Sequence, residues 1–288
     1  MERNIHNVRN RTQKIAIWVA FVCFTLYAIS LITPFVWVFF NSFKTERDFA
    51  TNPLVFPPDW HFDNYLKAFT ELEINGTNLV GMFANSILLT VIVTVPAVLF
   101  PCLTSYAVAK YPCRLTKPIF YIALFMQTIP IVGSFPAFYR LVVALNIKNN
   151  FALIWILYAS GTGLNFFLFH SFFQGLSWSY AEAAKVDGAG NYRVLFQIML
   201  PQAKAIITAL TITSLIGNWN DYMLPFLYMD KYPTVALGIY EYKLLQTYRA
   251  DRPMLFCGII MSIVPVLILF ACFSKTIMEN TSLGGLKG

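Results

Sequence analysis

Charged and small residues gather in one stretch of an otherwise apolar sequence, EAAKVDGAGNYRVLFQIMLP at residues 182–201. It contains two acids, Glu182 and Asp187, and two glycines, Gly188 and Gly190. Carboxylates in such a setting can cap a helix or pair with basic residues of another protein, and glycine permits a turn that a side chain would obstruct. From the residues alone the stretch predicts an amphipathic helix lying at a lipid boundary, with Glu182 only as a capping residue, and recognition of a partner is the alternative.

Motifs for covalent or metal-assisted chemistry are missing from the sequence. It has no phosphate-binding G-x-x-x-x-G-K-[ST] loop, no G-x-S-x-G and no H-E-x-x-H. The three histidines, His6, His61 and His170, are scattered, and the five cysteines form no C-x-x-C pair. We therefore expect no enzyme activity, no cofactor and no metal in this chain, and expect the energy for any uphill transport to come from a partner or an ion gradient.

The elements that hold this stretch are expected to be membrane-spanning helices. Of the 288 residues 57% are hydrophobic and only 12% are charged, whereas soluble domains carry about 25% charged residues. A spanning helix needs about 20 mostly apolar residues, and the first apolar run is too long for a signal peptide. The pattern predicts an all-α polytopic membrane protein, a single domain over 1–288 with six transmembrane helices at about 16–40, 83–108, 118–140, 151–174, 204–228 and 254–274.

Lysine and arginine near the helix ends predict the orientation of the chain. The loop 110–117 carries three basic residues and no acid, and the loop 44–73 carries three basic residues and six acids. We therefore expect both termini and the insert 175–203 in the cytoplasm, and the loop 44–73 outside. The loop 230–252, with four basic residues, fits the outside less well. Because the net charge of +7 is mainly such a topology signal, no nucleic-acid binding is expected.

Within the insert the residues predict a helix, a turn and a second helix. Ser179 and Glu182 have the spacing of a capping box, which would begin a helix at Ser179. Gly188 and Gly190 would stop that helix with a turn. Asn191 could cap the second helix, which would carry four apolar residues on one side: Val194, Leu195, Ile198 and Met199.

The same stretch fits the pattern E-A-A-x3-G-x9-I-x-L-P at every specified position. This long pattern resembles the loop of permease subunits in binding-protein-dependent ATP-binding-cassette importers. In that family the loop is a coupling helix that docks in a cleft of the cytoplasmic ATPase subunit, which binds the ATP. The resemblance implies that the ATPase-coupling residues of this chain are Glu182, Ala183, Ala184, Asp187, Gly188, Ile198, Leu200 and Pro201.

The resemblance extends over nearly the whole chain. The sequence is similar to the carbohydrate branch of these importers, in particular to the family of the maltose transporter's second membrane subunit. The segments that carry it include 83–86, 105–110, 129–147, 219–225 and the glycine-rich tail 284–288. It implies a bacterial cell-membrane location and four kinds of partner besides the lipid bilayer: a second homologous permease, two ATPase subunits, an extracytoplasmic solute-binding protein and a sugar. The loop 230–252 would contact the binding protein. Two departures are Asn146-Ile147, where Gly-Leu is expected, and Ser282-Leu283 before the tail glycines.

Polar residues inside a predicted span are candidates for the translocation path, because ionisable groups in a membrane are costly. Asp221 is the only acid in a predicted span, and it follows Asn218 and Asn220. Either these three side chains face the path, where they would bind sugar hydroxyls or hold a gate, or Asp221 lies at the outer interface, where water solvates it and Trp219 anchors the span.

Two other classes of function stay open from the residues alone. A self-sufficient secondary transporter would need ionisable groups inside the membrane and internal repeats. The sequence shows one acid in a predicted span, Asp221, and no clear repeat. A membrane-embedded enzyme would need clustered His, Asp or Ser within the spans, which the sequence lacks. A requirement for a separate ATPase distinguishes the importer permease from both.

Overall fold

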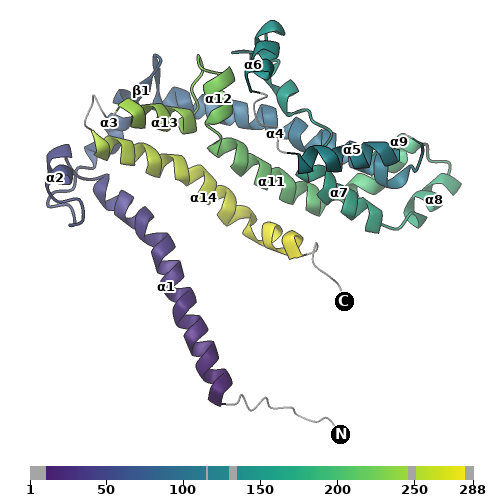
Figure 1. Ribbon diagram of the computed structural model, residues 1–288, viewed down its shortest axis with the longest axis horizontal. Helices are drawn as coiled ribbons and strands as arrows, with labels where there is room; N and C mark the ends of the chain where they lie inside the picture. The colour runs from purple at the N-terminus through teal and green to yellow at the C-terminus, as the bar shows by residue number, and fades with distance from the viewer. Residues whose placement is uncertain (1–10, 115, 130–134, 246–250, 283–288) are drawn as a thin grey trace.

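The computed structural model describes residues 11–114, 116–129, 135–245 and 251–282, with side chains from 13 to 275. Nearly all of the described elements are helices, and a long helix near the N-terminus diverges from the others (Figure 1). The predicted glycine-rich tail lies outside the described residues. Three described helices are long and apolar enough to cross a membrane: α1 (Arg11–Asn41), α4 (Leu79–Lys110) and α14 (Arg252–Ser282). They match the first, second and sixth predicted spans.

Each of the other three predicted spans contains two shorter helices in the part of the chain that the structure describes. The third contains α5 (Thr116–Thr128) and α6 (Phe135–Ala144), and the fourth contains the short helix η1 (Ile154–Tyr158) and α7 (Leu164–Gly175). The fifth contains α11 (Lys204–Asn220) and α12 (Met223–Tyr228). The fourth breaks at Gly163, whose φ of 115° is a backbone conformation that residues with a side chain rarely adopt. The count of six crossings stays a prediction.

A set of small elements packs where α1 ends and α4 begins. It comprises α2 (Glu46–Thr51), α3 (Asp63–Glu71), the antiparallel strands β1 (Glu73–Ile74) and β2 (Thr77–Asn78), and α13 (Val235–Leu245). The two-residue strands are a minor exception to the all-α prediction. They are joined by Asn75 and Gly76, whose φ angles of 51° and 78° are typical of the tightest hairpin turn.

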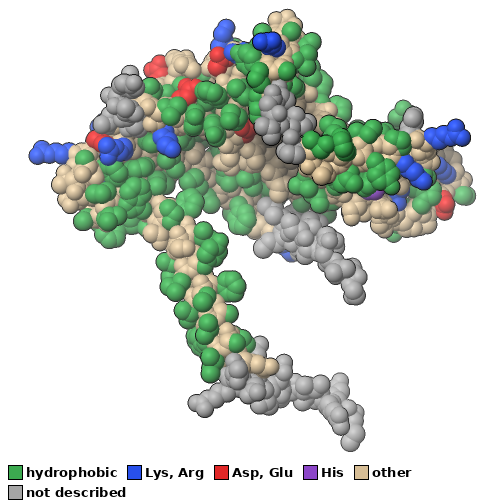
Figure 2. Space-filling model, in the orientation of Figure 1, with side chains coloured by type: hydrophobic (Ala, Val, Ile, Leu, Met, Phe, Trp, Pro, Cys, Tyr) green, Lys and Arg blue, Asp and Glu red, His purple; other side chains and the backbone are tan. Residues whose placement is uncertain are grey.

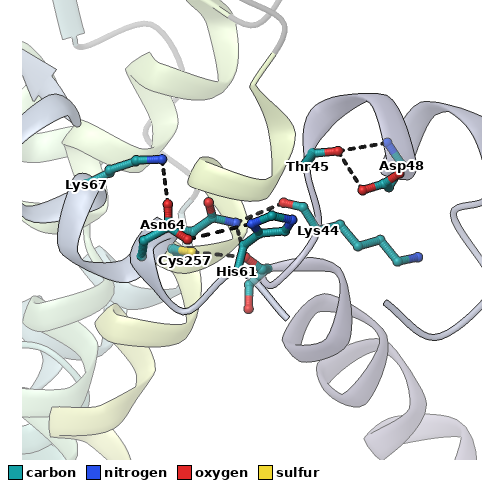
Figure 3. Close-up of polar contacts among 9 residues, drawn as sticks. Lys44, Thr45, Asp48, His61, Asn64, Lys67 and Cys257 are labelled. Carbon is teal, nitrogen blue, oxygen red and sulfur yellow. Dashed lines mark hydrogen bonds and ion pairs between the residues drawn. The ribbon is translucent and has the colours of Figure 1, made fainter. Parts of the chain in front are cut away.

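The backbone carbonyl groups that follow α1 accept hydrogen bonds from α3 and from α14 (Figure 3). The Asn64 Nδ2 donates to the carbonyl oxygens of Ser42 and Lys44, at 2.9 Å each. The Cys257 Sγ of α14 donates to the Ser42 carbonyl at 3.4 Å. Thr45 caps α2 by accepting from the Asp48 N–H at 3.2 Å. These bonds fix the end of α1 to α3 and α14, whereas the most apolar 18-residue window of α1 has no buried residue.

Helix α4 is the centre of the fold and packs against α7 and α11 along its length. Amide side chains reinforce this packing, since Asn165 of α7 donates to the Ala97 carbonyl of α4 at 3.1 Å. The departure at Asn146 also has a local reason. Its φ of 55° lies in the left-handed region, where asparagine is the residue that best replaces glycine, and the following Ile147 is buried.

Candidate functional site

The polar insert forms a helix, a turn and a second, irregular helix at the end of the molecule farthest from α2 (Figure 1). The first helix is α8 (Ser179–Val186). The second comprises α9 (Asn191–Arg193), the π-helical segment η2 (Val194–Met199) and α10 (Leu200–Gln202). It meets α11 at Ala203 with a bend of 71°. The predicted helix, turn and second helix are thus confirmed, and we call residues 179–202 the coupling segment after the role that the resemblance predicts.

The predicted caps of both helices are wrong by one residue. Helix α8 has Trp178 as its N-cap and no side-chain cap, because the backbone of Trp178 is already helical. The Ser179 hydroxyl instead lies 2.7 Å from the Ser177 hydroxyl, and the Ser177 Oγ accepts from the Ser179 N–H at 3.3 Å. At the second helix the N-cap is Gly190, and Asn191 is the first helical residue.

Gly188 makes the turn, as predicted. Its φ is 81°, in the left-handed region. Its N–H donates to the Lys185 carbonyl at 3.0 Å, and the Ala189 N–H donates to the Ala184 carbonyl at 2.9 Å, which is the Schellman pattern that ends many helices. A Cβ at this position would meet no atom within 4 Å, so the glycine is required by the backbone conformation and not by space.

One face of the coupling segment is packed against the helical body. Its buried residues join a hydrophobic cluster with Tyr106 of α4 and with Phe169 and Phe173 of α7; they are Ala181, Ala184, Val194 and Met199. Ile198 and Leu200 pack against the same cluster. Three predicted coupling residues, Ala184, Ile198 and Leu200, therefore hold the segment in place.

The opposite face is open to solvent. Four of the predicted coupling residues are exposed there, Glu182, Ala183, Asp187 and Gly188, and Pro201 is exposed farther along. Sequence reasoning missed two apolar side chains beside the turn, Val186 and Tyr192, which are 87% and 83% exposed. Their only signal was an apolar residue on each side of the glycine turn, at positions that the pattern leaves unspecified.

The base of the segment carries a cation–aromatic cluster that the sequence did not indicate. The Trp178 ring has the Lys185 Nζ 5.3 Å and the Lys110 Nζ 6.0 Å from its centroid. Lys110 ends α4 and also donates to the Leu176 carbonyl. Because such contacts stabilise by about 0.5–1 kcal/mol each at exposed sites, they orient α8 against the end of α4.

The three predicted path residues lie at the opposite end of α11 from the coupling segment. Asn218 Nδ2 donates to Thr94 Oγ1 of α4 at 2.9 Å, and Asn220 Nδ2 donates to the Ile216 carbonyl of its own helix at 2.9 Å. Asp221 Oδ1 accepts from the N–H groups of Met223 at 2.9 Å and Leu224 at 3.2 Å. Asp221, which follows α11, thus accepts from the first two N–H groups of α12, whose N-cap residue is Tyr222.

These hydrogen bonds allow two roles of Asp221 to be tested separately: an acceptor that stabilises the start of α12, and a charge on the translocation path. Asparagine caps a helix about as well as aspartate, whereas alanine loses about 1 kcal/mol. If the carboxylate acts as this acceptor, Asp221→Asn keeps both thermal stability and transport, and Asp221→Ala loses stability. We expect this result in a transport assay paired with thermal unfolding. A stable Asp221→Asn protein without transport would instead assign the charge to the path.

Comparison with known proteins agrees with this architecture. Residues 97–274 match the family described as binding-protein-dependent transport system inner membrane component. The diacetylchitobiose uptake system permease protein NgcG of Streptomyces coelicolor is 30% identical over 265 residues, which cover 90% of this chain and 85% of that protein. The arabinooligosaccharides transport system permease protein AraQ of Halalkalibacterium halodurans is 27% identical over 284 residues, covering 98% of this chain and 100% of that protein.

A solved structure supports the fold. One chain of a bacterial ABC transporter involved in the import of the acidic polysaccharide alginate superposes with a TM-score of 0.78 at 23% identity, over 92% of this chain and 98% of that chain. The prediction of an importer permease is confirmed over the alternative of a secondary transporter. Since the matched residues make up more than half of the sequence, the chain belongs to the family of inner membrane components of binding-protein-dependent transport systems.

Proposed function

We infer that this protein is one half of the translocation pore of an ATP-driven oligosaccharide importer in a bacterial inner membrane, and that its coupling segment docks on an ATPase subunit. One observation carries the docking proposal. The coupling segment is anchored on one face by a packed apolar cluster and offers, on the other, an open turn with Glu182, Ala183 and Gly188. A rigid base with an exposed, close-approach surface is what transmission of a mechanical displacement requires.

The chemistry of the exposed face fits a protein cleft. Small residues at Ala183 and Gly188 allow two backbones to approach closely, and Glu182 is free to meet a basic residue of the partner. Val186 and Tyr192 flank the turn as apolar contacts, and buried tyrosines are frequent anchors of protein interfaces. The orientation of the chain, with both termini and the coupling segment in the cytoplasm, follows from the basic loops and belongs to the same proposal.

Helix α1 supports the proposal of a second permease subunit. None of its apolar window is buried against this chain, and it diverges from the other helices (Figure 1). Its described surface is dominated by hydrophobic side chains (Figure 2). Since apolar helices in a bilayer associate through close packing, a homologous subunit beside α1 would complete the pore.

The substrate class is proposed from the relatives. NgcG and AraQ carry diacetylchitobiose and arabinooligosaccharides in their names, and a third relative, MalD of Streptococcus pneumoniae, is a maltodextrin permease that is 30% identical over 238 residues. An oligosaccharide presents many hydroxyls, which amide and carboxylate groups such as those of Asn218, Asn220 and Asp221 can bind along the path. An extracytoplasmic binding protein would deliver it at the 230–252 loop, whose described part is mainly α13.

Purification of the tagged chain from its native membranes tests the function. We expect an ATPase, a second permease and a binding protein to co-purify, and expect ATP hydrolysis to rise when the loaded binding protein is added. A Leu244→Cys variant should cross-link to the binding protein, because Leu244 is exposed at the end of α13. A folded chain that transports solute with no ATPase present would support a secondary transporter instead.

A further inference from the structure

A small apolar pocket lies at the C-terminal end of α1, far from the coupling segment. One wall is α1 from position 33 to 41, and the other is the chain segment 54–56. Its volume is about 190 Å³. Val36 and Phe40 line it from the helix, and Leu54 and Phe56 line it from the opposite side. The Phe40 and Phe56 rings meet edge to face with centroids 4.7 Å apart, so the two walls are in contact.

The two tryptophans of α1 place this pocket at the membrane boundary. Trp18 and Trp37 lie 19 positions apart in a continuous helix, which is about 28 Å at about 1.5 Å per residue. This distance is close to the hydrocarbon thickness of about 30 Å, and tryptophan is enriched at both interfaces. The pocket therefore begins at acyl-chain depth near Val36 and ends at headgroup depth near Asn41.

Asn41 gives the pocket a polar end, and one of its two polar side-chain atoms has no partner among the described residues. Asn41 as a whole is only 2% exposed, and its Nδ2 donates to the Trp37 carbonyl at 2.7 Å. Its Oδ1, however, is a buried acceptor, and no residue in the described part of the chain donates to it. A buried acceptor left unpaired costs about 1–3 kcal/mol, so a donor supplied from outside the chain would be favoured there.

The outer wall is held in place by buried and aromatic groups. Lys44, which is 1% exposed, donates from its Nζ to the carbonyl oxygens of Asn52 at 2.8 Å and Val55 at 2.6 Å. Its side chain extends away from Asn64 and His61 (Figure 3). The Trp37 Nε1 donates to the Pro53 carbonyl at 2.8 Å. The segment 52–55 is thus fixed against α1, and the pocket is a built feature of the fold.

We propose that this pocket binds one phospholipid of the adjoining leaflet, with an acyl chain against Val36 and Phe40 and a headgroup donor on the Asn41 Oδ1. The pocket is apolar near Val36 and has a polar acceptor near Asn41, and a lipid molecule likewise changes from an apolar acyl chain to a polar headgroup. Phosphatidylethanolamine has N–H donors for Asn41, whereas phosphatidylcholine has none, so the site prefers the former.

Photochemical labelling of the intact transporter tests the proposal. The complex is reconstituted in nanodiscs that contain a phosphatidylethanolamine with a diazirine on its acyl chain, irradiated, and mapped by mass spectrometry. We expect adducts at 33–41 and 54–56 to exceed those elsewhere on α1. Unlabelled phosphatidylethanolamine should compete with the probe for these positions at about one fifth of the concentration of phosphatidylcholine that is needed. This factor corresponds to one net hydrogen bond of about 1 kcal/mol.

Two variants and a control make the result decisive. Val36→Trp fills the pocket and should remove the enrichment, whereas Leu26→Trp, at another exposed position of α1, should not. Asn41→Leu should keep the adducts but abolish the preference between headgroups. If this variant does not fold, Val36→Trp decides alone.

Two results would overturn the proposal. Adducts spread evenly along α1 and unchanged by Val36→Trp would mean bulk lipid only. Adducts absent from 33–41, with cross-links from Val36→Cys to the second permease, would assign the pocket to that subunit.

Discussion

The substitution Gly188→Val is expected to lower ATP-driven transport by at least about tenfold and to release the ATPase from the purified complex. Gly188 has a φ of 81°, and an L-residue in the left-handed region costs about 1–2 kcal/mol, more when it is β-branched. A change of about 1.4 kcal/mol is a factor of ten in binding. The turn would relax to negative φ, and the exposed face with Glu182 and Tyr192 would no longer be presented as one surface.

A neighbouring glycine provides the matched control. Gly190 has a φ of −70° and a ψ of 164°, which any residue adopts, and a Cβ at either glycine would meet no atom within 4 Å. Gly190→Val adds the same side chain two positions away without backbone strain. We expect it to retain at least half of the wild-type transport and the bound ATPase. Equal losses in both variants would mean that added bulk, and not the turn at Gly188, disturbs the docking surface.

The long spans were predictable from the sequence because hydropathy alone decides them. Helices α1, α4 and α14 are uninterrupted apolar runs, and even Pro96 and Pro101 leave α4 continuous. The interrupted spans were not predictable in this way. An apolar run does not reveal that Gly163 turns the chain or that Asp221 accepts from the first N–H groups of a new helix, since both effects depend on backbone conformation and not on composition.

The coupling segment shows a similar division between what is local and what is tertiary. The turn at Gly188 follows from a glycine after a short helix, a local rule that holds here. Helix α8 begins at Ser179 as predicted, but the predicted capping box does not form, because Trp178 is the N-cap and no side chain caps the helix. The ring of Trp178 is positioned by Lys110, which is distant in sequence, and no pattern within the insert contains that information.

The division of the predicted coupling residues into two groups also required the structure. The spacing of the pattern treats Ala183 and Ala184 alike, but one is exposed and the other is buried in the cluster with Phe173. The residues that hold the segment and the residues that could bind a partner alternate along the sequence. Only the packing against α4 and α7 distinguishes them.

This packing makes a second prediction with a large effect, at the base of the coupling segment. Phe173 is 0% exposed, and its ring meets the Tyr106 ring edge to face with centroids 5.3 Å apart. It belongs to the cluster that includes Val194 and Met199 of the coupling segment. Because a buried phenylalanine truncated to alanine costs about 3–5 kcal/mol, Phe173→Ala is expected to detach the segment from α7 and α4. Amide hydrogen exchange at residues 179–202 should increase, and the apparent melting temperature in detergent should fall.

Phe270→Ala is the matched control, since it makes the same change on α14 at a side chain that is 51% exposed. It should leave the exchange of residues 179–202 unchanged and shift the melting temperature little. The predicted pattern is therefore specific: Phe173→Ala frees the coupling segment while the exchange of α14 stays at its wild-type rate, because the two are packed in different clusters. If exchange rose equally throughout the chain, the coupling segment would unfold only together with the whole protein, which would contradict a separate anchoring of this segment by the Phe173 cluster.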